Sequence, residues 1–186
     1  MIKKSSIRRI CVATLALFIL LIIYFFPTKD FKTTKNLHYI KENEMPIFLK
    51  DTNNYVARTT IIKKSDSTIN QVKEIISYLT KNSSNSSYIQ EGFKPLIPEN
   101  TKIIDLNLDD GTLTINFTKE LINIDKENEE DMLEAIIYSI LEIKEIKNIK
   151  INIEGNPLVY LPNSKIKLPD TFDKTYGINK LYNIDS

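Results

Sequence analysis

The chain has 186 residues, a formal net charge of +1, one histidine and one cysteine. This length accommodates one membrane segment and one domain of ordinary size. Four basic residues (Lys3, Lys4, Arg8 and Arg9) lie together at the N-terminus, and the remaining 21 basic and 24 acidic residues give a net charge of −3. We therefore expect no nucleic-acid partner, because the folded part lacks an excess of positive charge.

An uncharged apolar run from residue 10 to residue 26 follows this basic cluster. As a helix it would be ~25 Å long, close to the hydrocarbon thickness of a bilayer. A cleaved signal peptide would end in small residues, but this run ends in Tyr24, Phe25, Phe26 and Pro27. A lipoprotein anchor needs its cysteine at the end of the run, but Cys11 lies at the start. We therefore predict an uncleaved transmembrane anchor at residues 10–26, with residues 1–9 in the cytoplasm and the rest exported.

Residues 27–45 are polar and are predicted to form a tether, in which the single histidine, His38, is assigned no chemistry. Two strands are predicted next, at Pro46–Lys50 and Tyr55–Lys64, with turn residues between them. Thr68 and Gln71 have the spacing of a capping box and predict the start of a helix. Its apolar stripe consists of Ile69, Val72, Ile75, Ile76 and Leu79.

The strongest local signal is a hairpin between residues 104 and 118. Apolar residues alternate with polar ones on both sides of Asp110-Gly111. This alternation predicts two strands, each with one buried and one exposed face. Asp110 and Gly111 are the predicted turn residues, since both central positions of a primed two-residue turn need positive φ.

A second helix is predicted to begin at Asn128, with acidic residues in its first turn. Its apolar face consists of Leu133, Ile136, Ile137, Ile140, Leu141 and Ile143. A strand at residues 149–153, a turn and a short return strand follow. The predicted fold class is α+β, a two-layer sandwich in which one mixed sheet carries two helices on one face in the order ββαββαβ. The domain would span residues 46–162, followed by a C-terminal tail at residues 163–186.

No pattern in the sequence indicates catalysis, a metal or a cofactor. The four glycines form no phosphate loop, and no serine or cysteine nucleophile has a histidine base at a recognised spacing. Asp109-Asp110 is better explained by turn formation than by paired catalytic carboxylates. Glu129-Glu130-Asp131 is better explained by the dipole of the second helix than by a cation site. We therefore expect a protein that is not an enzyme.

Three segments together resemble the GerMN domain family of bacterial sporulation and spore-germination proteins. They are residues 47–57 (IFLKDTNNYVA), residues 72–79 (VKEIISYL) and residues 95–121 (PLIPENTKIIDLNLDDGTLTINFTKEL). The family pattern has a glycine where Asn100 stands and a serine where Thr118 stands. Asn tolerates left-handed backbone and Thr keeps the hydroxyl. Some members carry two such domains, whereas this chain has the length for one.

The resemblance implies a ring-building-motif-like domain that assembles or localises a channel complex spanning the two membranes around a developing spore. Its partners would be other sporulation membrane or channel proteins and further copies of itself, through helix-to-sheet contacts. The domain would lie outside the cytoplasm, in the space between the forespore and mother-cell membranes. The candidate interface residues are Lys73, Glu74, Phe93, Glu142 and Glu145.

A second hypothesis is a ligand- or cell-wall-binding module that acts in spore germination. It would bind through the open face of the sheet or through the loop from Lys81 to Phe93, which carries Tyr88. The alternative for Phe93 is that it closes the edge of the core.

Overall fold

The computed structural model describes residue 15 and residues 40–177. The chain divides into two units, residues 1–39 and Ile40–Ser186, and the fold below is that of the second unit. The predicted anchor at residues 10–26 lies outside the described residues, apart from Leu15. Within the described part, no helix has both the length and the apolar character needed to cross a membrane.

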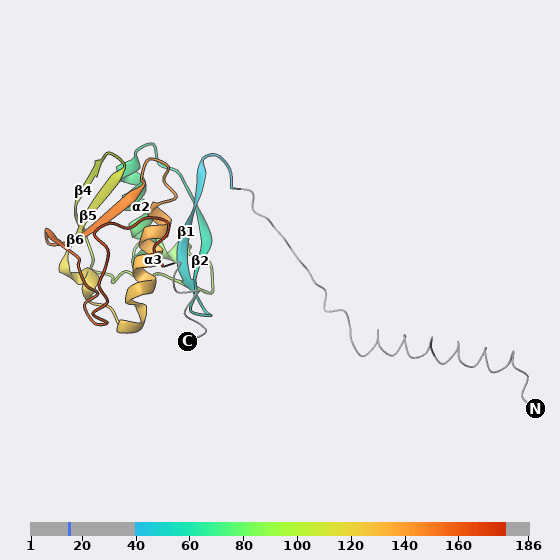
Figure 1. Cartoon of the computed structure of the whole chain (residues 1–186). Coiled ribbons are helices and arrows are strands. Elements are labelled where there is room, and N and C mark those ends of the chain that lie inside the picture. Colours follow the sequence, from blue (N-terminus) through green and yellow to red (C-terminus); the bar gives the residue numbers. More distant parts are fainter. Residues whose placement is uncertain (1–14, 16–39, 178–186) are drawn as a thin grey trace, which may run out of the picture. The chain divides into compact units, whose positions relative to one another are not determined.

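The described residues of the second unit form two α-helices and two β-sheets (Figure 1). The elements are β1 (Glu44–Asp51), β2 (Val56–Lys63), α2 (Thr68–Leu79), β3 (Phe93–Lys94), β4 (Ile103–Asp109), β5 (Thr112–Phe117), α3 (Glu129–Ile140), β6 (Asn148–Ile153) and β7 (Asn156–Pro157). One sheet has the strand order β2-β1-β3 and the other β4-β5-β6-β7. β5 and β6 are parallel, and all other neighbouring strands are antiparallel.

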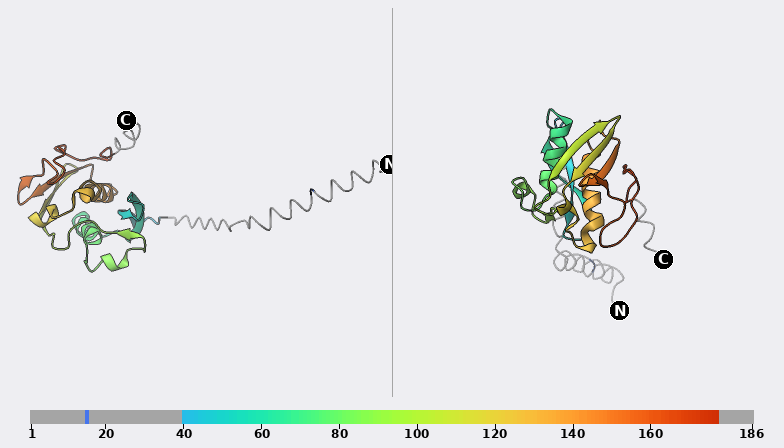
Figure 2. Two further views of the ribbon diagram at one scale, coloured as in Figure 1. Left: turned by 90° about the horizontal axis from the view of Figure 1, so that it is seen from below. Right: turned by 90° about the vertical axis from the view of Figure 1, so that its left-hand side faces the viewer.

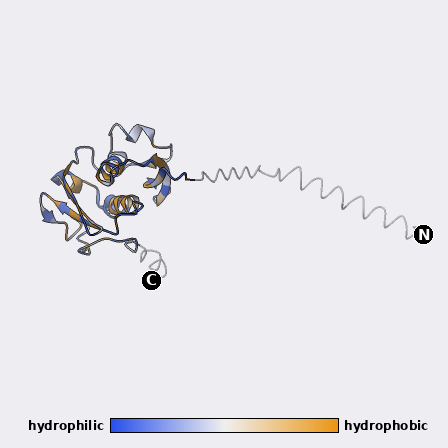
Figure 3. Ribbon diagram, turned by 90° about the horizontal axis from the view of Figure 1, so that it is seen from above, coloured by the Kyte–Doolittle hydropathy of each residue, from blue (hydrophilic) through white to orange (hydrophobic). Residues whose placement is uncertain are grey.

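The predicted single mixed sheet with helices on one face is wrong. β1 and β2 belong to a sheet of their own, and α2 and α3 lie between the two sheets (Figures 1 and 2). The physical reason is the composition of α3, because a helix with apolar residues around most of its circumference needs a layer on more than one side. Its buried residues are Glu129, Met132, Leu133, Ala135, Ile136, Ile137, Ser139 and Ile140. Coloured by hydropathy, the two helices form the apolar centre of the domain (Figure 3).

The hairpin β4–β5 has the predicted register and turn. Leu108 pairs with Leu113 across the strands, and Asp110 and Gly111 have φ of 41° and 74°. The carbonyl of Gly111 accepts hydrogen bonds from the amides of Lys147 (2.8 Å) and Asn148 (3.2 Å). The turn therefore also holds the start of β6 beside β5.

Helix α3 covers the edge of β1 that β3 leaves open. β3 pairs only with Lys50 and Asp51, at the end of β1. Further along the strand, the amide of Phe48 donates to Oγ of Ser139 at 2.8 Å. The ammonium of Lys50, which is only 5% exposed, lies 2.6 Å from the carboxylate of Asp131. Covering a strand edge with a helix satisfies its backbone groups and prevents further pairing.

Neither of the two predicted helix caps makes a side-chain hydrogen bond to the first turn of its helix. The N-cap of α2 is Ser67, so the capping box of Thr68 and Gln71 does not form. The side chain of Gln71 instead accepts a hydrogen bond from the amide of Ser65 and fastens the loop before the helix. Asn128 is the N-cap of α3, but its Oδ1 accepts from Nζ of Lys50 at 2.9 Å and makes no cap hydrogen bond. Tertiary contacts thus take the polar side chains that local spacing would assign to caps.

The segment after Pro162 is part of the core. Leu168 and Phe172 are 4% and 2% exposed. Phe172 and Ile149 exchange backbone hydrogen bonds of 2.8 Å in both directions, which adds Phe172 to the free edge of β6.

Replacing Ser139 tests the contact between α3 and β1. Ser139→Ala leaves the amide of Phe48 without its acceptor, and we expect a loss of ~1–3 kcal/mol in the free energy of unfolding. Urea denaturation of both proteins measures this difference. Ser77→Ala, the same change on the more exposed helix α2, is the control and should alter stability by less than ~0.5 kcal/mol. Equal stability of the Ser139→Ala variant and the wild type would contradict the proposed role of this hydrogen bond.

Candidate interaction surfaces

The five predicted interface residues do not lie on one surface. Lys73 and Glu74 belong to the outer side of α2, where Lys73 is exposed and Glu74 half-buried. Glu142 and Glu145 follow α3 and line a hollow that also includes the first turn of α2. Phe93, in β3, lines a different hollow. The structure therefore brings Glu142 and Glu145 together and separates them from Phe93.

Glu142 has two partners within its own domain. Its carboxylate lies 3.6 Å from the guanidinium of Arg58 and 3.9 Å from the ammonium of Lys174. Both basic side chains are more than half exposed. Such exposed ion pairs contribute at most ~1 kcal/mol. Glu142 thus joins β2 to the C-terminal segment weakly.

Phe93 lies at one side of a hollow of about 360 Å³ formed with the turn between β1 and β2. The carboxylate of Asp51 orders this turn by accepting hydrogen bonds from the amides of Tyr55 (2.9 Å) and Asn53 (2.8 Å). These hydrogen bonds, that of Tyr55 first, lower the pKa of Asp51 although desolvation opposes them. Tyr55 follows directly and is 70% exposed, while Phe93 is half-buried. No pattern in the sequence singles out Tyr55, because one aromatic residue next to a turn is not distinctive.

A buried carboxylate holds the C-terminal segment against α3. Glu129 has no exposed surface, and its carboxylate accepts hydrogen bonds from the amides of Asn163 (2.7 Å) and Ser164 (2.9 Å) and from Nδ2 of Asn163 (2.9 Å). Burial alone would raise the pKa of Glu129, but these hydrogen bonds outweigh burial and lower it. The predicted role of Glu129 in the helix dipole is therefore accompanied by a tertiary role that sequence spacing could not reveal.

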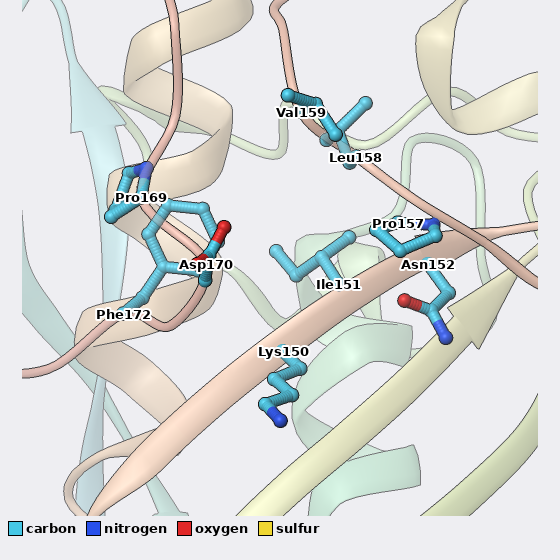
Figure 4. Close-up of a pocket in the computed structure, with 9 residues that line it drawn as sticks. All are labelled: Lys150, Ile151, Asn152, Pro157, Leu158, Val159, Pro169, Asp170 and Phe172. Atoms are coloured by element: carbon cyan, nitrogen blue, oxygen red, sulfur yellow. The ribbon is translucent and has the colours of Figure 1, made fainter.

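A cleft of about 300 Å³ lies between β6 and the C-terminal segment (Figure 4). Ile151 lies at its centre, between Phe172 on one side and Leu158 on the other. Lys150 and Asp170 are the only charged residues that line it. The residues that line the cleft include neither a nucleophile nor a histidine, and they present apolar, amide and charged groups.

The outer face of the four-stranded sheet is polar across its three long strands. The register aligns one residue from each of β4, β5 and β6 in three rows, namely Asp105, Asn116 and Asn152; Asn107, Thr114 and Lys150; and Asp109, Thr112 and Asn148. All acidic residues of this face belong to β4. Its side chains are exposed or half-buried, whereas the opposite face carries Leu113, Ile115 and Phe117 in the core.

Among residues 40–177, His, Cys, Asp and Glu side chains form no group of three or more that could hold a metal ion. The described surfaces therefore offer hydrogen-bonding, charged and aromatic contacts.

A family model described as Germane, sporulation and spore germination, matches residues 36–159. The chain is also 29% identical over 135 residues to the spore germination protein GerM of Bacillus subtilis (strain 168). The match covers 72% of this chain and 36% of that protein, so the chain spans about a third of the length of this relative.

Two solved structures have a similar fold. The first GerMN domain of the sporulation protein GerM from Bacillus subtilis has a TM-score of 0.65 and 22% identity, covering 71% of this chain and 98% of that domain. The tandem GerMN domains of the same protein give a TM-score of 0.66 and 22% identity, covering 72% of this chain and 47% of that structure. At this identity the likeness establishes the fold, which is that of a GerMN domain.

Glu129→Gln tests the buried carboxylate. A glutamine would present an amide donor to one of the two backbone donors, so we expect a loss of ~1–3 kcal/mol in the free energy of unfolding at neutral pH. The pKa of Glu129 is below its ordinary value of 4.5 only in the folded chain. Its contribution is therefore complete above pH 4.5 and declines as the pH falls through the lower folded pKa.

The measurement is denaturant unfolding of both proteins from pH 7 downwards, with the exposed Glu127→Gln as the control. The difference between the wild type and Glu129→Gln should narrow below pH 4.5. A difference that is independent of pH would show that the charge of Glu129 is not what holds the segment.

Proposed function

Because the chain belongs to the Germane family of sporulation and spore germination, we propose that it is a non-enzymatic, membrane-anchored component that assembles or localises a sporulation channel complex outside the cytoplasm. The observation that carries this proposal is the family match, which extends over two thirds of the chain and coincides with the GerMN fold. Its partners would be other sporulation membrane or channel proteins.

The described surfaces support a role in contacts. The domain has an open polar sheet face, and Lys150 and Asp170 are the only charged residues in the cleft beside β6. Neither surface brings together a nucleophile, a base and a stabilising donor, which an active site requires. Contact with another macromolecule is the use that these surfaces fit best.

The anchor is the second part of the proposal. The apolar run at residues 10–26 would span the membrane, with the basic residues 1–9 in the cytoplasm. The tether at residues 27–45, the domain at residues 46–162 and the tail at residues 163–186 would then lie on the outer side, in the space between the forespore and mother-cell membranes.

A second candidate function is the binding of a cell-wall ligand in germination. It is favoured by the hollow beside Phe93. The exposed Tyr55 directly follows Asn54, which lines this hollow, and Tyr88, in the loop before Phe93, is 73% exposed. Exposed aromatic rings with a polar edge are suited to contact with amphipathic ligands. However, Phe93 also packs against the core, and a purely structural role explains its half-burial.

Deletion of the chain in the source organism tests the proposed function. We expect fewer heat-resistant spores, with the defect at engulfment or later, and recovery when the full chain is restored but not when residues 40–186 are produced in the cytoplasm. Normal spore formation with impaired germination would favour the second candidate. Normal spore formation and normal germination would contradict both.

Leu17→Arg tests the anchor. An arginine at the centre of the apolar run should cost ~2.5–3.5 kcal/mol of insertion free energy, and the domain would remain in the cytoplasm or be poorly anchored. Protease added to protoplasts of non-sporulating cells that produce the chain, in which an exported domain faces the medium, should degrade the wild-type domain and spare that of the variant. A wild-type domain protected from protease would refute export, and a mature N-terminus beyond Pro27 would refute anchoring.

A further inference from the structure

Two long strands of the domain, unlike the two-residue terminal strands β3 and β7, have an outer edge on which no other described strand pairs. β2 is the terminal strand of one sheet and β4 is the terminal strand of the other. They lie on opposite sides of the domain (Figures 1 and 2). The edge of β1, in contrast, is covered by α3. An open strand edge presents backbone donors and acceptors that can pair with another strand.

The backbone groups that face outward follow from the strand registers. In β4 the closing pair of the hairpin is Asp109 and Thr112, which exchange hydrogen bonds in a two-residue turn. Because bonded and non-bonded pairs alternate, the N–H and C=O of Leu106 and Leu108 face away from β5. In β2 the amide of Lys64 donates to the carbonyl of Asn43, so these two residues form a bonded pair. Counting back from this pair, the N–H and C=O of Lys63 and Ile61 face away from β1.

The two open edges carry opposite charges. β4 (Ile103–Asp109) contains Asp105 and Asp109 and no basic residue. β2 (Val56–Lys63) contains Arg58 and Lys63 and no acidic residue. Two copies of the same edge would place like charges opposite each other, which is destabilising. The acidic edge of one copy and the basic edge of another would place opposite charges together.

The spacing of the charges also matches. Asp105 and Asp109 are four residues apart and share one face of β4. Arg58 and Lys63 are five residues apart, but β2 has one more residue than β1 between the pairs Phe48–Arg58 and Pro46–Ile61. This irregularity brings both basic side chains to one face, opposite Phe48 and Glu44. Each pair therefore spans the same four positions of its sheet, or ~13 Å along the strand.

Both charge pairs are accessible. Asp105, Asp109 and Lys63 are exposed, and the side chain of Arg58 is 54% exposed although it lies 3.6 Å from Glu142. Ile104, the one aliphatic residue of the β4 edge with a largely open surface, is 52% exposed. A paired strand would cover this side chain.

We propose that the acidic edge β4 of one copy of this chain pairs, in the parallel direction, with the basic edge β2 of the next copy, because this direction places Asn107 beside Ile61 and the opposite charges on one face. The contact is head-to-tail, so two paired copies together keep one free acidic and one free basic edge, and further copies can extend the row or close it into a ring. Confinement to one membrane would raise the effective concentration of the edges. This inference concerns contacts between copies and does not depend on the proposed role in sporulation.

The helix-to-sheet contact implied by the family resemblance is less available in this domain. α3 lies between the two sheets, and only α2 has an outer side. Strand pairing instead uses the open edges of β2 and β4.

Charge reversal of each edge tests the proposal in the full-length chain in detergent micelles. The acidic-edge variant is Asp105→Lys with Asp109→Lys, and the basic-edge variant is Arg58→Glu with Lys63→Glu. Sedimentation velocity at low and high salt measures association. The wild type should associate more weakly at high salt than at low salt. Each variant alone should associate at least about tenfold more weakly than the wild type.

An equal mixture of the two variants should recover association, because every edge of one variant then meets an oppositely charged edge of the other. Recovery also shows that both variants are folded. The control, Glu91→Lys with Glu127→Lys, changes the net charge by the same amount as the acidic-edge variant at exposed positions outside both strands and should behave like the wild type.

Three outcomes would overturn the proposal: a wild type that stays monomeric, variants that associate as well as the wild type, or folded variants whose mixture does not recover association.

If circular dichroism shows that a charge-reversal variant is unfolded, a disulfide test replaces the charge-reversal test. In a Cys11→Ser background, one copy carries Asn107→Cys and the other Ile61→Cys. A disulfide between the copies under mild oxidation supports the paired edges, and its absence overturns them.

Discussion

Helix α3 carries apolar side chains on almost its whole circumference, so it requires a packed layer on each side. The four-stranded sheet supplies one layer, and the β1–β2 hairpin with α2 supplies the rest. The polar groups along α3 are matched by specific partners: Ser139 accepts from β1, Asp131 pairs with Lys50, and Glu129 binds the C-terminal segment. These three contacts tie segments distant in sequence to one helix. The outer faces and outer edges of both sheets take no part in these three contacts.

The sequence allowed prediction of the local elements but not of their arrangement. The alternation on both sides of Asp110-Gly111 predicted the β4–β5 hairpin and its turn, because period and turn chemistry are local properties. The separation of the sheets depends on whether β1 pairs with β4 or packs on α3, and spacing carries no information on this choice. Met132, Ala135 and Ser139 do indicate a second packed layer in the sequence. They give α3 apolar or small side chains on the side away from its main apolar stripe. For the same reason the candidate interface residues were predicted as one group but lie in separate places, since Phe93 is positioned by its pairing with Asp51.

The arrangement of the domain supports the proposal that it acts through contacts. Its carboxylates are used in turns, in ion pairs and in holding segments, as Asp51, Glu142 and Glu129 illustrate. Its clefts have mixed apolar and polar walls and no catalytic set. The Germane family match supplies the biological setting, and the proposed anchor would place these surfaces outside the cytoplasm. A three-layer domain with two open, oppositely charged edges suits repeated contacts in an assembly.

Purification of the tagged full-length chain from membranes of sporulating cells tests the central claim most directly, that this protein acts by binding other components of a sporulation membrane complex. The account predicts that defined sporulation membrane proteins are recovered with it, that their recovery is lost when residues 46–162 are replaced by an unrelated domain, and that growing cells yield none of them. Recovery of the chain alone, or with cell-wall fragments in place of proteins, would contradict it.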